Sequence, residues 1–275
     1  MPAARIEVIR PRPAALPRLA LFDFDGTLSL LRAGWQAVML DWMVEHLRRA
    51  PRAEGETALR AQAAEAIHRL TGQPTLRQMR WLCEAIRERG GAPESPERYK
   101  QIYLRRLEAH IAGRIAGVEE GRVPPEAWLV PGAPAILRAL RARGIPCYIA
   151  SGTDETAVRR EASVLGIAGF FGGIFGARPA DPAFDKGAVI ARLTAAHRLR
   201  PGELVAFGDG GVEIAAARAA GGIAVGVALD ETTRAGLDAG KRRRLIEAGA
   251  HLIIPHFQPH DALLAWLFGE RGVPG

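Results

Sequence analysis

The sequence predicts an α/β fold, a doubly wound parallel sheet into which an all-helical domain is inserted. Short apolar runs, which suit strands buried on both faces, alternate with helical patterns along most of the chain. Such alternation, with right-handed crossovers, produces a parallel sheet flanked by helices. The alternation stops between residues 33 and 127, where only amphipathic helical patterns occur, so a second unit is expected there.

The predicted strands are short apolar runs, several of which stop at glycine or at an acidic residue. They lie at 19–24, 145–150, 204–207, 223–228 and 252–254, with a weaker candidate at 170–175 and a short edge strand around 6–9. Helices are expected between them, and glycine ends the first two. These helices lie at 133–143, 154–165, 186–198, 212–220 and 237–248.

Four amphipathic helical patterns fill the interval that lacks strands. They lie at 35–49, 56–70, 75–89 and 96–113, and glycines and prolines at 72–74 and 90–93 separate the last three. We therefore predict a core made of residues 1–32 and 128–275, and a helical domain of residues 33–127. The insertion follows the first core strand, where an open α/β sheet has its ligand crevice.

Charge alone does not identify a partner. The 275 residues carry a net charge of +7, but only Lys100, Lys186 and Lys241 among the 37 basic residues are lysine. The arginines are spread along the chain, and the one dense run, 241–244, is expected to form the solvated face of a helix. Because no aromatic residues interleave with that run, we expect no nucleic-acid partner. A positive field that attracts small anions is the milder interpretation.

Compartment and membrane association are predicted from apolar runs and cysteines. No apolar run approaches the ~18 residues that a membrane span needs, and prolines interrupt the arginine-containing N-terminus before any signal-peptide core forms. The two cysteines, Cys83 and Cys147, cannot build a disulfide framework. We expect a cytoplasmic protein without membrane contact.

A pair of carboxylates, Asp23 and Asp25, follows the first predicted core strand. Gly26 is expected to bend the chain here, so the two side chains can take different roles. One carboxylate can act as a nucleophile or metal ligand while the other reaches a leaving group. The competing interpretation for this pair alone is an ordinary turn at a strand exit.

Two further clusters favour a bound phosphate. Ser151, Gly152 and the two residues after them are expected to open a helix, whose free N–H groups attract anions, although a simple helix cap is the alternative. Lys186 begins another helix, where a lysine opposes the helix dipole unless an anion compensates it. The alternative for Lys186 is a surface lysine paired with Asp185.

The fourth cluster is GDGGVE at 208–213. Asp209 and Glu213 supply the hard oxygen ligands that Mg²⁺ prefers, and the glycines let the backbone approach a site. Asp209 as a helix cap, with Glu213 in the first turn, is the alternative. Four such clusters at the ends of four predicted strands are unlikely to coincide by chance, because carboxyl ends of parallel strands share one edge.

DFDGTL at 23–28, SGT at 151–153, Lys186 and GDGGVE at 208–213 resemble, in order and spacing, the four motifs of the haloacid dehalogenase superfamily. The resemblance covers 19–35 and about 131–257. A helical insertion between the first two motifs is similar to the cap of the phosphoglycolate phosphatase and β-phosphoglucomutase branch.

The resemblance implies a role for each motif. Asp23 would be the nucleophile that forms an aspartyl-phosphate, and Asp25 the acid and base, with its carbonyl on Mg²⁺. Ser151, Gly152 and Lys186 would hold the phosphoryl oxygens, and Thr27 would stabilise the first loop beside them. Asp209 would bind Mg²⁺ with support from Glu213, which departs from the aspartate usual in this motif.

The leading hypothesis is a Mg²⁺-dependent phosphatase acting on a small phosphorylated metabolite. A phosphomutase of the β-phosphoglucomutase type is a close alternative, and a catalytically silent basic module that binds RNA or protein is an alternative of another class. Candidate substrate contacts in the helical domain are Trp35, Gln73 and Thr75, although Trp35 also suits the core of that domain.

Overall fold

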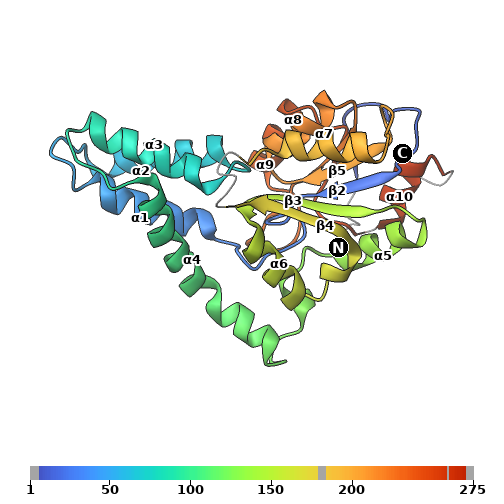
Figure 1. Ribbon diagram of the computed structural model, residues 1–275, viewed down its shortest axis with the longest axis horizontal. Coiled ribbons are helices and arrows are strands. Elements are labelled where there is room, and N and C mark those ends of the chain that lie inside the picture. Colours follow the sequence, from blue (N-terminus) through green and yellow to red (C-terminus); the bar gives the residue numbers. More distant parts are fainter. Residues whose placement is uncertain (1–5, 179–183, 259, 271–275) are drawn as a thin grey trace.

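The computed structural model describes residues 6–178, 184–258 and 260–270 as a mostly parallel seven-stranded sheet with helices on both faces (Figure 1). The strands are β1 (Glu7–Val8), β2 (Leu19–Phe22), β3 (Cys147–Asp154), β4 (Phe171–Ala177), β5 (Leu204–Gly208), β6 (Ile223–Val227) and β7 (Leu252–Ile254). Their order across the sheet is β1-β7-β6-β5-β2-β3-β4. All neighbours are parallel except β1, which pairs antiparallel with β7.

The helices fall into two groups along the chain. The inserted group is α1 (Trp35–Leu47), α2 (Glu56–Leu70), α3 (Thr75–Glu88) and α4 (Pro96–Glu119). The sheet is flanked by α5 (Ala133–Ala142), α6 (Glu155–Val164), α7 (Lys186–Ala196), α8 (Gly211–Ala219), α9 (Ala239–Glu247) and α10 (His260–Phe268), and short 3-10 turns lie at Pro125–Trp128 and Ala168–Phe170. Among these described residues, no helix combines the length and the apolar character needed to cross a bilayer.

The strand order sets the position of any ligand site. From β2 the chain first builds outward through β3 to β4, and then crosses back to β5 on the other side of β2. In open α/β sheets, ligands bind at the carboxyl ends of the strands where this direction reverses. The reversal lies at β2, the strand that runs into Asp23 and Asp25.

Each face of the sheet buries its own apolar cluster. On one face the rings of Phe22 and Phe207 stack with centroids 4.6 Å apart, beside Phe257 and the leucines of α10. Leu21 and Ala206 face the opposite cluster, which α7, α8 and α9 cover. Burial on both faces explains why the strands read as nearly continuous apolar runs.

Several predicted elements differ from the structure in extent. The strand expected at 145–150 continues to Asp154 as β3, so Ser151 and Gly152 lie in extended chain and not at the start of a helix, which begins at Glu155. Helix α4 runs to Glu119, past Gly113, where a Cβ would meet no atom within 4 Å. Helix α10 was not predicted, because its apolar run has too few polar residues to show a period.

The chain leaves and re-enters the core at adjacent points. Leu30 N–H donates to the carbonyl of Trp128 (2.7 Å), and Val130 N–H donates to the carbonyl of Leu28 (2.9 Å). The helices α1–α4 project from this junction to one side of the sheet (Figure 1). The four helices therefore occupy the interval in which the sequence showed no strand, while the exact domain boundaries stay a prediction.

Gly132, at the start of α5, has a positive φ of 82°. A Cβ on this residue would lie 2.8 Å from the carbonyl carbon of Phe257, whose N–H donates to the carbonyl of Pro131. Gly144, which follows α5, has a φ of 69° but would meet nothing within 4 Å. A comparison of Gly132 with Gly144 therefore distinguishes the cost of a left-handed backbone from the cost of steric overlap.

We predict that Gly144→Ala lowers the free energy of unfolding by about 1 kcal/mol, the cost of a left-handed alanine. Gly132→Ala should cost about 1–3 kcal/mol more, because the methyl group also displaces backbone. Urea unfolding of both variants measures the difference. Equal losses would contradict the predicted overlap with Phe257.

Candidate active site

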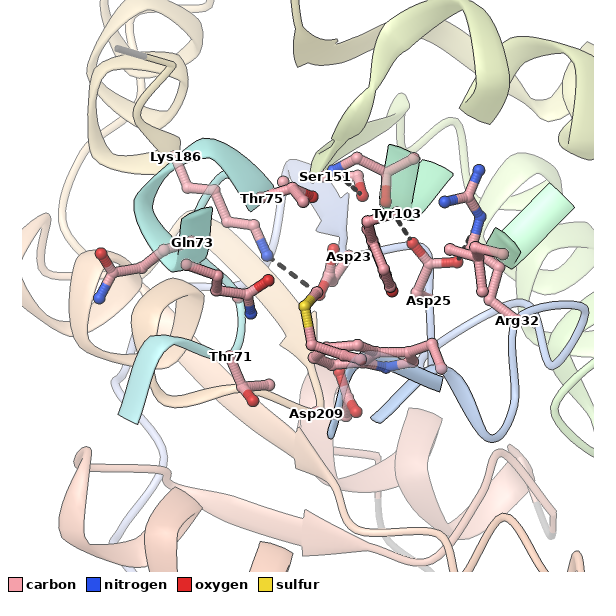
Figure 2. Close-up of a pocket in the computed structure, with 17 residues that line it drawn as sticks. Asp23, Asp25, Arg32, Thr71, Gln73, Thr75, Tyr103, Ser151, Lys186 and Asp209 are labelled. Atoms are coloured by element: carbon pink, nitrogen blue, oxygen red, sulfur yellow. Dashed lines mark hydrogen bonds and ion pairs between the residues drawn. The ribbon is translucent and has the colours of Figure 1, made fainter. Parts of the chain in front are cut away.

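A pocket of about 620 Å³, its opening included, lies at the carboxyl ends of β2, β3 and β5 (Figure 2). Residues of the sheet core and residues of the inserted helices both line it. Asp23 lies near its centre, with Lys186 on one side and Asp25 with Arg32 on the other. The lining residues are Asp23, Asp25, Arg32, Trp35, Met39, Thr71, Gly72, Gln73, Thr75, Gln78, Tyr103, Leu107, Ser151, Gly152, Thr153, Lys186 and Asp209.

Asp23 directly follows β2 and is 6% exposed. Its Oδ1 accepts a hydrogen bond from the N–H of Phe24 (2.8 Å), and its Oδ2 lies 3.0 Å from Lys186 Nζ. Burial raises the pKa of Asp23 well above its usual value; the nearby carboxylates of Glu213 and Asp209 add to this, while Lys186 opposes it. A carboxylate held in this way keeps its charge only with cationic partners.

Lys186 is the first residue of α7 and is 2% exposed. Its Nζ lies 3.0 Å from Asp23 Oδ2 and 2.9 Å from Glu213 Oε2. Burial alone would lower the pKa of Lys186, but these two carboxylates outweigh it and raise the pKa. The alternative of a surface lysine paired with Asp185 is therefore wrong, since Asp185 instead caps α7 through the N–H of Ala188.

Glu213 is fully engaged by groups of the protein itself. Its Oε1 accepts from the N–H of Gly210 (2.7 Å), and its Oε2 accepts from Lys186 (2.9 Å). Oxygens of Asp23, Asp209 and Glu213 nevertheless all lie within 4.8 Å of one another. In this arrangement Glu213 anchors Lys186 and the start of α8, and direct metal ligation by Glu213 stays a prediction.

Asp25 lies opposite Lys186 in the pocket (Figure 2). Its Oδ2 accepts from Thr153 Oγ1 (2.7 Å), and its Oδ1 lies 3.7 Å from Arg32 Nε. Burial raises the pKa of Asp25 to about 6; the carboxylates of Glu161 and Asp209 add to this, and Arg32 and Thr153 oppose it. Among the described groups, Oδ1 has no hydrogen-bond partner, so it can serve a ligand.

Gly26 bends the first loop as the sequence suggested, with a φ of 74°. A Cβ on Gly26 would lie 2.3 Å from Asp209 Oδ2, so the close approach of Asp209 to the loop requires glycine. Thr27, in contrast, is fully buried and is not among the pocket residues. Its Oγ1 has no hydrogen-bond partner among the described residues, and its predicted stabilising role stays a prediction.

The remaining predicted residues all line the pocket. Ser151 is 2% exposed, and its Oγ accepts from the N–H of Thr153 (3.2 Å). Gly152 meets the inserted domain, because a Cβ there would lie 2.9 Å from the carbonyl oxygen of Gln73. Trp35, Gln73 and Thr75 line the side of the pocket that the inserted helices form.

Two buried cations near the pocket were not predicted. Arg32 donates to both carboxylate oxygens of Glu161, at 3.0 and 2.6 Å, from the loop that leads into α1. Lys241 was placed on a solvated helix face, which is wrong: its Nζ is buried at 2.9 Å from Asp209 Oδ2 and 2.5 Å from Glu231 Oε1. The scarcity of lysine in this chain was a signal for Lys241, whereas nothing in the pattern marked Arg32.

The cluster has more negative than positive groups. Six carboxylates face three cations in the ion pairs described above, so the ionised cluster carries excess negative charge; the carboxylates are Asp23, Asp25, Glu161, Asp209, Glu213 and Glu231. Burial makes such an excess costly unless a further cation compensates it. Hard carboxylate oxygens converge within 4.8 Å, which is the donor chemistry that Mg²⁺ prefers. The residues present therefore fit a magnesium ion.

Comparison with known proteins agrees with the motifs. A family model described as haloacid dehalogenase-like hydrolase matches residues 17–221. The chain belongs to this family. Among curated proteins, none matches the sequence.

Solved structures show the same fold at low identity. A predicted phosphoglycolate phosphatase from Haemophilus somnus is 17% identical with a TM-score of 0.59, over 92% of this chain and 100% of that chain. A phosphonoacetaldehyde hydrolase-like protein from Oleispira antarctica is 14% identical with a TM-score of 0.66, over 96% of this chain and 98% of that chain. A putative β-phosphoglucomutase from Thermotoga maritima is 19% identical with a TM-score of 0.50, over 85% and 92%.

We predict that Lys241→Met lowers the free energy of unfolding by about 3 kcal/mol, because it leaves Asp209 and Glu231 buried without their cation. Added MgCl₂ should recover part of this loss, since binding to the folded state stabilises it. Thermal unfolding with and without the salt measures both effects.

Lys100→Met is the matched control. Lys100 pairs with Asp154 at 2.5 Å, but both side chains are partly exposed, at 23% and 30%. Loss of this pair should cost about 1 kcal/mol or less. Equal destabilisation of the two variants would contradict the structural importance assigned to Lys241.

Proposed function

We propose that this hydrolase is a Mg²⁺-dependent phosphatase that cleaves a small phosphorylated metabolite through an aspartyl-phosphate. One observation carries the proposal. Asp23 is held against Lys186, and a second carboxylate with a raised pKa, Asp25, stands on its other side. A nucleophile, a phosphate-binding cation and a proton donor thus share one pocket.

Hydrolysis would take two steps. In the first, an oxygen of Asp23 attacks phosphorus, the bond from phosphorus to the leaving oxygen breaks, and Asp25 gives its proton to that oxygen. In the second, Asp25 takes a proton from water, whose oxygen attacks phosphorus and releases phosphate and the Asp23 carboxylate. A pKa of about 6 lets Asp25 carry a proton near neutral pH and accept it back.

Charge repulsion is the main obstacle, because a carboxylate must approach a phosphate dianion. Lys186 and Ser151, both on the pocket wall beside Asp23, would bind the phosphoryl oxygens. The side chains of Asp23 and Asp209, with the backbone carbonyl of Asp25, would hold Mg²⁺. The bound metal supplies further positive charge against the phosphoryl oxygens.

A phosphomutase would use the same first step and return the phosphoryl group to a sugar. The likeness to the putative β-phosphoglucomutase concerns the fold alone, so product analysis has to separate the two activities. A basic RNA-binding module is less well supported, because Lys241 of the densest basic run is buried in the site. We expect no nucleic-acid or membrane partner.

We also propose a cytoplasmic location. Cys83 and Cys147 are both buried and free, which accords with a reducing compartment. Neither is among the residues that line the pocket.

Asp23→Asn should lower the rate of p-nitrophenyl phosphate hydrolysis at least about 1,000-fold relative to the parent protein. A loss on this order is expected when an enzyme loses its nucleophile. An amide cannot form the acyl-phosphate and also loses its charge toward Lys186. Release of p-nitrophenolate with MgCl₂ measures the effect, and circular dichroism confirms that the variant is folded. Activity equal to that of the parent protein would refute the proposed role of Asp23.

Asp25→Asn should separate the two steps. p-Nitrophenolate leaves without much help from an acid, so the first step survives, whereas water attack lacks its base. We expect a burst of p-nitrophenolate close to one equivalent per protein, followed by slow turnover, in stopped-flow measurements. Asp23→Asn is the control that shows no burst, and a linear time course for Asp25→Asn with unchanged rate would contradict its role as base.

A further inference from the structure

The part of the pocket that the inserted helices line has a composition that restricts the substrate. Four polar but uncharged side chains line it from α3 and the turn between α2 and α3: Thr71, Gln73, Thr75 and Gln78. Figure 2 shows Thr71, Gln73 and Thr75 on this wall. An apolar surface adjoins them, formed by Trp35 and Met39 of α1.

The cations that line the pocket are already neutralised. Lys186 is paired with Asp23 and Glu213, at the phosphoryl end. Arg32, the other one among the described lining residues, donates to both oxygens of Glu161 and also lies 3.7 Å from Asp25. A second anionic group on a substrate would therefore find no unpaired cation on this wall, and its burial would be costly.

The wall does offer hydrogen bonds that the protein does not use. Gln78 is 3% exposed, yet its amide makes no hydrogen bond with the described residues, and it lines the pocket. The amide atoms are not among the fully buried polar atoms that lack a partner, so they open on the pocket, where hydroxyl groups of a ligand can pair with them. Thr71 Oγ1 donates to the carbonyl of Ile67 at 2.8 Å, which leaves its oxygen free to accept.

These three features together describe one chemical class. Hydroxyl groups both donate and accept, as the amides and threonine hydroxyls of this wall require. The C–H face of a polyhydroxylated carbon chain or ring packs on apolar and aromatic surface such as that of Trp35 and Met39. A carboxylate or a second phosphate has no counterpart here.

We propose that the organic part of the substrate is an uncharged polyhydroxylated skeleton, a sugar or polyol monophosphate, and that the wall of Gln73, Thr75 and Gln78 selects it against phosphorylated acids. This inference rests on the proposed phosphatase function. It distinguishes the chain from the phosphocarboxylate specificity that the name of the Haemophilus somnus neighbour describes for that protein.

Matched substrate pairs test the proposal. Glycerol 3-phosphate and 3-phosphoglycerate differ by one carboxylate in place of a hydroxymethyl group, and glucose 6-phosphate and 6-phosphogluconate differ by a carboxylate and by ring opening. We expect kcat/KM to be at least about tenfold higher for the uncharged member of each pair, because the wall has no cation for the acid. Higher kcat/KM for the acids, or equal values in both pairs, would overturn the proposal.

Hydrolysis of p-nitrophenyl phosphate separates this proposal from the proposed function. If the protein hydrolyses that ester but prefers the phosphorylated acids, the substrate class is wrong and the phosphatase function stands. If neither the ester nor any member of the pairs is hydrolysed, the proposed function fails and this inference fails with it.

Two variants test the wall itself. Gln78→Met keeps the volume but removes the amide, and we expect kcat/KM for glucose 6-phosphate, relative to p-nitrophenyl phosphate, to fall at least about tenfold. Gln73→Arg adds a cation at a half-buried position, where a charge costs less than at the buried position of Gln78. This variant should raise the ratio of kcat/KM for 6-phosphogluconate to kcat/KM for glucose 6-phosphate at least about tenfold. Unchanged ratios in both folded variants would overturn the assignment of this wall.

Discussion

The buried pairing of Lys186 with Asp23 and Glu213 is the interaction on which the site depends. Each of these side chains is costly to bury as a charge alone, and the two ion pairs with Lys186 offset part of that cost at the edge of the sheet. Glu213 also ties the start of α8 to Lys186 through the N–H of Gly210. Asp23 is thus held by elements that are distant in sequence, and its surroundings are strongly charged before any ligand binds.

The sheet explains why the motifs meet, and this part was predictable from sequence. Buried parallel strands must be apolar on both faces, so polar residues at their ends stand out, and the strand order brings these ends to one edge. Asp23, Asp25, Ser151 and Asp209 all line one pocket for this reason. Strand ends were less predictable: β3 continues to Asp154 because, after a register shift past Ala150, Asp154 pairs again with Ala177 of β4.

The missing parts of the site depend on partners that no local pattern reveals. Lys241 lies in a run of four basic residues, and only the path of α9 past Asp209 and Glu231 decides that this one is buried. Arg32 gains its role from Glu161, which lies on α6 far along the chain. The role of Glu213 as an anchor of Lys186 is likewise visible only once α7 and α8 are adjacent.

The junction between the core and α1–α4 has a consequence for how such a protein can diversify. Because Leu30 and Trp128, and Leu28 and Val130, are hydrogen-bonded neighbours, the chain leaves and re-enters the core at one place, and the length of the inserted segment does not alter the pairing of the strands. Recombination could exchange the helical segment while leaving the order of the core strands intact. The core and the inserted helices would then be free to evolve at different rates.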